Sequence, residues 1–93
     1  MFIGLLTLEL FIPGAESLKD KRSVVNSLLD KLRARFNVSA AQIDDHDLWQ
    51  RATLAVVVVS NDATVAQTVM NHVRDLAETD NRCDVAECRT EIL

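Results

Sequence analysis

The apolar positions of the chain predict six secondary-structure elements in the order β-α-β-β-α-β. Phe2–Ile12 and Thr53–Val59 carry apolar side chains on both parities, which is typical of strands that are covered on both faces. Val38–Asp44 is a weaker run and indicates an edge strand, while Cys83–Leu93 alternates polar and apolar residues as a half-exposed strand does. We therefore expect the first and third strands at the centre of one sheet.

Two segments between these strands repeat their apolar residues at helical spacing. The first follows the turn residues Pro13 and Gly14 and begins at Ser17, with Asp20 as the second half of a capping box. The second begins at Ser60–Asp62, which offers helix-capping side chains. The expected buried stripes are Leu18, Val25, Leu28, Leu29, Leu32 and Phe36 in the first helix and Val65, Val69, Val73 and Leu76 in the second.

This order of elements leaves few topologies. Two right-handed crossovers with both helices on one face place the first and third strands side by side and the second and fourth outside them. We predict an α+β protein with a ferredoxin-like sandwich, in which two helices cover one face of a four-stranded antiparallel sheet. The 93 residues show neither an internal repeat nor a linker, so residues 1–93 are expected to form a single domain.

The charges are unevenly placed along the chain. The formal net charge is −4, which argues against nonspecific binding of nucleic acid by the whole surface. Residues 17–36 nevertheless carry six basic and two acidic side chains, whereas residues 62–93 carry three basic and seven acidic ones. The two parts of the chain therefore have opposite sign.

The cysteines and the N-terminal run predict a reduced, cytoplasmic protein with no membrane segment. Cys83 and Cys88 are five residues apart in a predicted strand, so their side chains should point to opposite faces, too far apart for a disulfide. They also form neither a metal nor a redox motif. Residues 1–12 are apolar, but they are interrupted by Glu9, lack a basic leader and are too short to cross a bilayer.

The basic first helix is the first candidate site. Lys19, Lys21 and Arg22 stand near the helix start, where cations oppose the helix dipole, so stability does not explain them. Free backbone N–H groups beside clustered cations can bind phosphate. Together with Lys31, Arg33 and Arg35, one side of the helix could follow a nucleic-acid backbone. The alternative is a solvated helix face that pairs with the acidic second half.

The corner between the second and third strands is the second candidate site. Asp44, Asp45, His46 and Asp47 suggest metal or acid–base chemistry, but consecutive residues rarely converge on one ion, so we predict neither a metal site nor a catalytic residue here. Asp47 is expected to cap the turn, and Arg51 is the only basic residue of the hairpin. Leu48 and Trp49 are expected to close the end of the core, or Trp49 to anchor a partner or stack on a base.

The sheet face away from the helices is the third candidate. Either parity of Val56–Val59 leaves two valines on this face, and an exposed apolar patch of this kind usually marks an interface. The chain has only four aromatic residues, which makes base stacking on the central strands a weaker interpretation. We therefore predict a homodimer that covers this face.

Four spaced motifs resemble one known family. They are Ile12-Pro13-Gly14-Ala15, Ser17-Leu18-Lys19-Asp20-Lys21-Arg22, Arg35-Phe36-Asn37-Val38-Ser39 and Asp47-Leu48-Trp49-Gln50-Arg51-Ala52. In this order the motifs are similar to those of the YlxP-like family of small bacterial proteins of unknown function. The resemblance implies a ferredoxin-like fold, a cytoplasmic bacterial protein, and genes that often lie beside those for translation initiation and ribosome maturation. It implies no catalytic residues.

These observations favour a non-enzymatic binding protein without a cofactor. The leading hypothesis is binding of RNA or a ribosomal particle through the basic first helix. One alternative is a protein-interaction or dimerisation module that uses the open sheet face or the Trp49 corner, and another is a small-molecule regulatory domain with its ligand at a dimer interface. An enzyme is not favoured, because the chain has no glycine-rich phosphate loop, no nucleophile elbow and no metal-spaced His/Cys set.

Overall fold

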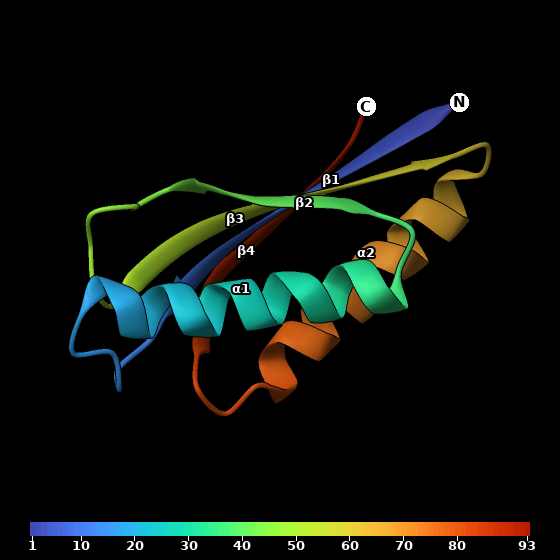
Figure 1. Cartoon of the computed structure of the whole chain (residues 1–93). Helices are drawn as coiled ribbons and strands as arrows, with labels where there is room; N and C mark the ends of the chain where they lie inside the picture. Colours follow the sequence, from blue (N-terminus) through green and yellow to red (C-terminus); the bar gives the residue numbers. More distant parts are fainter.

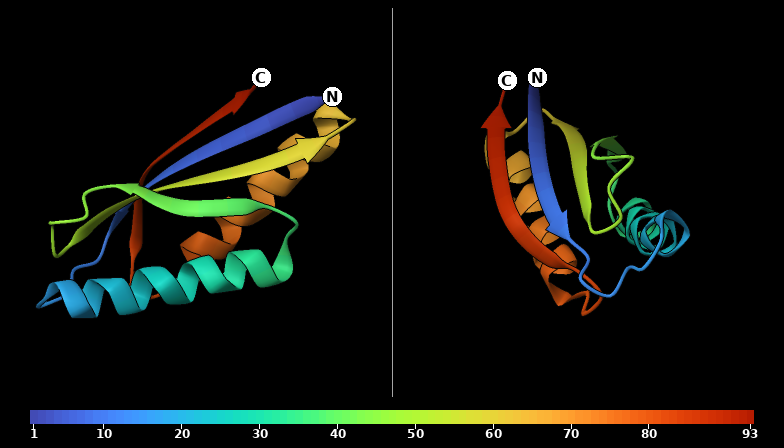
Figure 2. Two further views of the ribbon diagram at one scale, coloured as in Figure 1. Left: turned by 45° about the horizontal axis from the view of Figure 1, so that its top comes forward. Right: turned by 90° about the vertical axis from the view of Figure 1, so that its left-hand side faces the viewer.

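The computed structural model describes all 93 residues. Its elements are β1 (Phe2–Phe11), α1 (Leu18–Arg35), β2 (Ser39–Asp44), β3 (Arg51–Ser60), α2 (Ala63–Thr79) and β4 (Asp84–Ile92). The strands form one antiparallel sheet in the order β2-β3-β1-β4, and both helices lie on the same face of it (Figures 1 and 2). The predicted ferredoxin-like sandwich is therefore confirmed. Neither helix has the length and apolar character needed to cross a membrane.

The two strands with the most hydrophobic sequences lie at the centre of the sheet, as predicted. Leu6 and Leu8 of β1 stand opposite Val56 and Leu54 of β3, and all four side chains are buried under the helices. Gly4 lies on the same face and lets α2 approach, because a Cβ atom there would come within 3.0 Å of the Met70 Sδ atom of that helix. The helix-covered side of the central strands is thus buried and closely packed against α2.

The helix starts agree with the predicted capping residues. The Ser17 side chain accepts a hydrogen bond from the Asp20 backbone N–H (3.1 Å), and the Asp20 side chain accepts one from the Glu16 N–H (3.0 Å). Asp62 caps α2 by accepting from the N–H groups of Thr64 and Val65. These bonds satisfy donors that the first turn of a helix leaves free.

The buried stripe of α2 is rotated from the predicted one. Val73 is buried as expected, but Val65 is half exposed, and the stripe is completed by small or flexible residues that the prediction placed at its margin. These are Ala66, Met70 and Ala77. The buried positions of α2 hold alanines and a flexible Met rather than valines, because the helix lies close to the sheet at Gly4.

An irregularity in β4 corrects the expected placement of the cysteines. Opposite Glu9 and Leu10 the register of β4 passes from Glu87 to Val85, so one residue of β4 is left without a partner. Such a bulge reverses the parity of the strand. Both cysteines consequently pack on the core side rather than on opposite faces, and both are free thiols. Burial raises the pKa of Cys83 to about 11, so this thiol stays protonated.

Candidate functional site

The six cations predicted on α1 do not share one surface. Lys21 is buried, and its Nζ donates to the backbone carbonyl oxygens of Asp45 (2.6 Å) and His46 (3.0 Å). Burial, and secondarily the charge of Arg22, lower the pKa of Lys21. Lys21 is therefore unavailable to a phosphate group, and the prediction that it contacts nucleic acid is corrected. Its side chain instead joins α1 to the turn after β2.

The remaining cations of α1 divide into engaged and free ones. Arg33 donates to the carbonyl oxygen of Ala40 in β2 (2.6 Å) and lies 3.7 Å from Asp30. Lys31 reaches the other side of the helix, where its Nζ lies 4.0 Å from the Asp80 carboxylate. The exposed cations without a carboxylate partner are Lys19, Arg22 and Arg35. The predicted continuous basic side of α1 is thus reduced to three free side chains.

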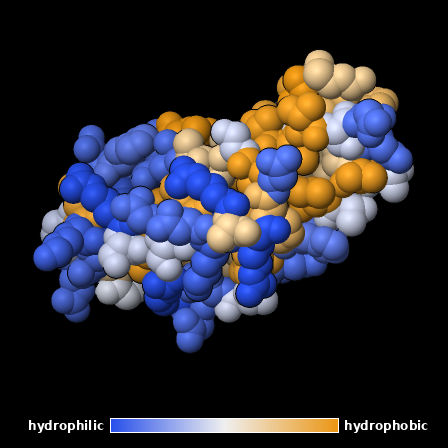
Figure 3. Space-filling model, turned by 45° about the vertical axis from the view of Figure 1, so that its right-hand side comes forward, coloured by the Kyte–Doolittle hydropathy of each residue, from blue (hydrophilic) through white to orange (hydrophobic).

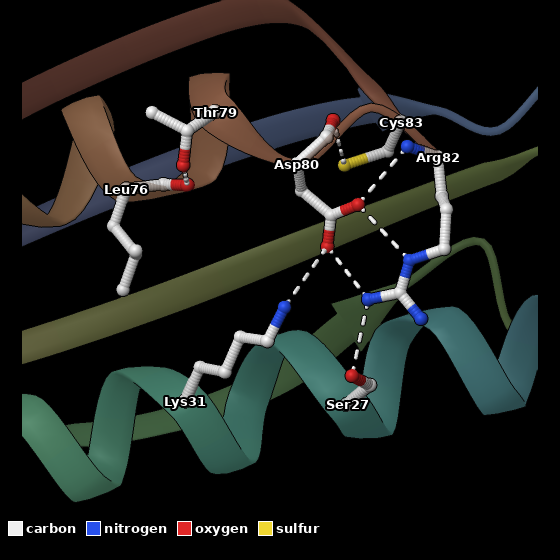
Figure 4. Close-up of polar contacts among 7 residues, drawn as sticks. All are labelled: Ser27, Lys31, Leu76, Thr79, Asp80, Arg82 and Cys83. Atoms are coloured by element: carbon white, nitrogen blue, oxygen red, sulfur yellow. Dashed lines mark hydrogen bonds and ion pairs between the residues drawn. The ribbon is translucent and has the colours of Figure 1, made fainter.

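Asp80, at the end of α2, is a structural anchor that the sequence analysis did not single out. Figure 4 shows its carboxylate between Arg82 and Lys31; Arg82 Nη2 lies 2.7 Å from Asp80 Oδ2 and also donates to Ser27 of α1 (3.0 Å). Hydrogen bonding to the Arg82 side chain lowers the pKa of Asp80 to about 2. The cluster ties the end of α2 to the middle of α1.

The turn between β2 and β3 is held by residues other than the predicted one. Asp45 has a left-handed backbone (φ 65°), its N–H donates to the Asp44 carboxylate (2.8 Å), and its own carboxylate accepts from the Thr53 hydroxyl (2.9 Å). An Asp tolerates this conformation better than most residues. The capping role expected of Asp47 belongs to Asp44 and Asp45.

Leu48 and Trp49 do not close the core, in contrast to the structural role predicted for them. Their exposed fractions are 47% and 56%. Ile12 and Ala52 close this end of the core instead, since both are buried and the Ile12 N–H donates to the Gln50 carbonyl (2.8 Å). The side chains of Leu48 and Trp49 are therefore exposed to solvent.

A groove lies beside this corner on the open face of the sheet. It consists of two adjoining hollows of about 740 and 510 Å³ that share Phe11, Leu48 and Arg51. We call them together the corner groove. Four carboxylates line the first hollow, and we call them together the acidic wall; Trp49 lines the second hollow. The four acidic residues are Glu9, Asp44, Asp45 and Asp84.

Glu9 sits in an unfavourable electrostatic position in this wall. It stands directly opposite Glu87 of β4, where like charges repel. Hydrogen bonding to the Glu87 carboxyl and repulsion by its charge raise the pKa of Glu9, with a smaller contribution from Asp45. Arg51 is the one cation that lines the groove. The four carboxylates of the acidic wall thus outnumber the one cation, Arg51, that lines the same groove.

The opposite end of the open face is apolar. Ile3 pairs with Val59 of β3 and exchanges two backbone hydrogen bonds with Leu93, and the next row pairs Leu5 with Val57. Val59 is 63% and Leu93 66% exposed. Figure 3 shows hydrophobic residues gathered towards the end of the molecule that carries the termini. We call Ile3, Leu5, Val57, Val59 and Leu93 the apolar end.

Sequence reasoning did not single out the acidic wall. Glu9 was noted only as an interruption of an apolar strand, and Asp84 as one of many acidic residues. The strand register brings them together, because Phe11 stands opposite both Arg51 and Asp84 while Glu9 stands opposite Thr53. The one sign of this site in the sequence was Glu9, a single charged residue in the middle of an apolar strand.

Comparison with known proteins assigns a family but no activity. A family model described as "Protein of unknown function (DUF503)" matches residues 3–90. The "Uncharacterized protein YlxP" of Bacillus subtilis (strain 168) is 30% identical over 89 residues, which cover 96% of this chain and 97% of that protein.

Solved structures similar to the chain share its fold at low sequence identity. A de novo designed protein with a ferredoxin fold has a TM-score of 0.57 and 10% identity, over 99% of this chain and 85% of that one. SnoaB, a cofactor-independent oxygenase from Streptomyces nogalater, has a TM-score of 0.50 and 11% identity, over 99% and 90%. Rv0793 from Mycobacterium tuberculosis has a TM-score of 0.50 and 17% identity, over 100% and 93%.

Proposed function

The chain belongs to the DUF503 family, and from its structure we propose that it is a non-enzymatic binding module that forms a homodimer through the apolar end of its open sheet face. The observation that carries this proposal is the row Val59–Ile3–Leu93, whose two outer members are 63% and 66% exposed. A contiguous apolar patch on a sheet face usually marks an interface.

A second copy of the chain is a suitable partner for this surface. Burying an exposed Val or Leu side chain contributes about 1.5–3 kcal/mol, and a two-fold contact buries each residue of the patch on both copies. Arg89 and Glu91 stand on β4 at the rim of the same face, opposite Thr7 and Leu5. A rim with both signs can be self-complementary under two-fold symmetry.

Sedimentation velocity of a charged variant tests this proposal. Val59→Lys places a cation within the apolar contact and is expected to convert the dimer to a monomer at micromolar concentration. Ala34→Lys, on the exposed side of α1, adds the same charge away from the sheet and serves as the control. Identical sedimentation of the two variants would remove the proposed interface.

Nucleic acid is the second candidate ligand, and the free cations of α1 favour it. Lys19, Arg22 and Arg35 are exposed and have no carboxylate partner, so each can contact a phosphate. The double variant Lys19→Glu/Arg22→Glu is expected to lose co-sedimentation with ribosomal particles at low salt. The control Thr68→Glu/His72→Glu/Arg74→Glu changes the net charge equally on α2, and equal loss in both variants would count against a site on α1.

A further inference from the structure

We propose that the corner groove binds a basic, partly apolar segment of a partner protein, with Lys or Arg side chains against its acidic wall and an apolar side chain against Phe11 and Trp49. The inference rests on the proposed role as a binding module but not on the homodimer. The groove lies at the Phe11–Arg51 end of the central strands, whereas the apolar end lies at the Ile3–Val59 end.

Charge complementarity selects the partner. The wall presents Glu9, Asp44, Asp45 and Asp84 against the single cation Arg51. The facing carboxylates of Glu9 and Glu87 repel each other when both are ionised. Arg89, 4.0 Å from Glu87, offsets part of this repulsion, and a second cation placed beside Glu9 would relieve more of it. An acidic ligand would meet the same repulsion, and a neutral one would leave it unchanged.

The apolar rim supplies the rest of the contact. Trp49 is 56%, Leu48 47% and Phe11 37% exposed, and all three line one hollow with Arg51. Trp and Arg are enriched among residues that dominate binding energy in protein interfaces. The groove therefore combines an anchoring surface for an apolar side chain with an acidic wall that favours a neighbouring cation.

The groove is also formed before any partner arrives. Lys21 holds the turn through the carbonyl oxygens of Asp45 and His46. Gln50 donates to the carbonyl oxygens of Pro13 (3.2 Å) and Ala15 (3.3 Å), which ties the start of β3 to the segment before α1. A rigid binding surface loses less conformational freedom on association, so more of the contact energy is available for affinity.

Peptide titration of the full chain tests the proposal. The probe is the peptide Leu-Lys-Leu-Lys-Leu with blocked ends, the comparison is Leu-Glu-Leu-Glu-Leu, and the readout is the fluorescence of Trp49, the only tryptophan. We expect the basic peptide alone to change this fluorescence, with an affinity that falls as salt is added. Glu9→Gln/Asp84→Asn should weaken binding about fivefold, as expected for the loss of exposed charge pairs.

The matched control is Asp75→Asn/Glu78→Gln, which removes two charges from α2 and should leave the affinity unchanged. The proposal is overturned if neither peptide binds, if the acidic peptide binds equally, or if the groove variant binds the basic peptide like the control. A second copy in the groove is a further overturning outcome, seen as dissociation of the dimer by Trp49→Ala. Dissociation of the dimer by Val59→Lys without loss of peptide binding separates this site from the dimer contact.

Discussion

The amino group of Lys21 in α1 donates to the backbone carbonyl oxygen of Asp45 at 2.6 Å, which joins the first helix to the turn between β2 and β3. The same amino group reaches the carbonyl oxygen of His46 at 3.0 Å, and the lysine is fully buried. A buried ammonium group requires such partners, because an unpaired one would be costly to desolvate. The first helix and the corner between β2 and β3, which the sequence suggested as two separate candidate sites, are therefore joined by direct hydrogen bonds.

Replacing Lys21 with Met should destabilise the fold while keeping the aliphatic part of the side chain. The change removes two charge-assisted hydrogen bonds and leaves two carbonyl groups without their donor, at a cost of about 3 kcal/mol. Urea unfolding followed by circular dichroism measures this loss. The control Lys31→Met removes a long ion pair (4.0 Å) whose lysine is about half exposed and whose carboxylate keeps Arg82 as a partner, so it should cost less than about 1 kcal/mol. Equal stabilities of the two variants would contradict the structural role of Lys21.

Asp80→Asn should lower stability at neutral pH and remove part of its acid dependence. Asp80 titrates at about 2 in the folded protein against an ordinary value of 3.8. Its contribution is thus present above pH 3.8 and is lost as the pH falls towards 2, and a shift of this size corresponds to about 2 kcal/mol. Urea unfolding of both proteins at pH 7 and pH 2 measures it. An advantage of the wild type that persists unchanged at pH 2 would be inconsistent with this assignment.

Glu9→Gln should raise the unfolding temperature at neutral pH. Because the folded pKa of Glu9 lies above its ordinary value of 4.5, the fold favours the protonated form. The contribution of Glu9 to the free energy of unfolding is fully present below pH 4.5 and is lost as the pH rises through the pKa of Glu9 in the folded protein. The gain from Gln should therefore be present at pH 7 and vanish at acid pH. A thermal scan at both pH values checks this, and an unfolding temperature below that of the wild type at pH 7 would refute it.

Gly4→Ala should destabilise the contact between the sheet and α2. An added Cβ would lie 2.9 Å from Val58 Cγ1 and 3.0 Å from Met70 Sδ, and overpacking of this kind costs about 1–3 kcal/mol. Gly14→Ala is the control, because nothing lies within 4 Å of the position of its Cβ. Chemical denaturation of the two variants should separate them, and equal midpoints would show that the close approach of α2 is not required.

Periodicity predicted the order of the elements because each strand and helix repeats its apolar residues over several turns or pleats. The third strand was expected over Thr53–Val59 and extends over Arg51–Ser60. The pairing of the central strands followed from the handedness of the crossovers, which does not depend on details of side chains. The fold was therefore predictable almost entirely from the sequence.

The candidate sites were less predictable because they depend on single side chains. Lys21 falls four residues before Val25, in phase with the buried stripe of α1, but charge alone suggested an exposed position. Trp49 was expected either to close the core with Leu48 or to contact a partner or a base, and it does not close the core because Ile12 and Ala52 already fill that end. The acidic wall depends on the register between strands, which a single sequence does not specify residue by residue.

The homodimer is the central claim, and the molar mass of the wild-type chain in solution tests it most directly. Light scattering during gel filtration at micromolar concentration should give twice the chain mass of 10.4 kDa. A mass of 10.4 kDa at every micromolar concentration examined would contradict the claim.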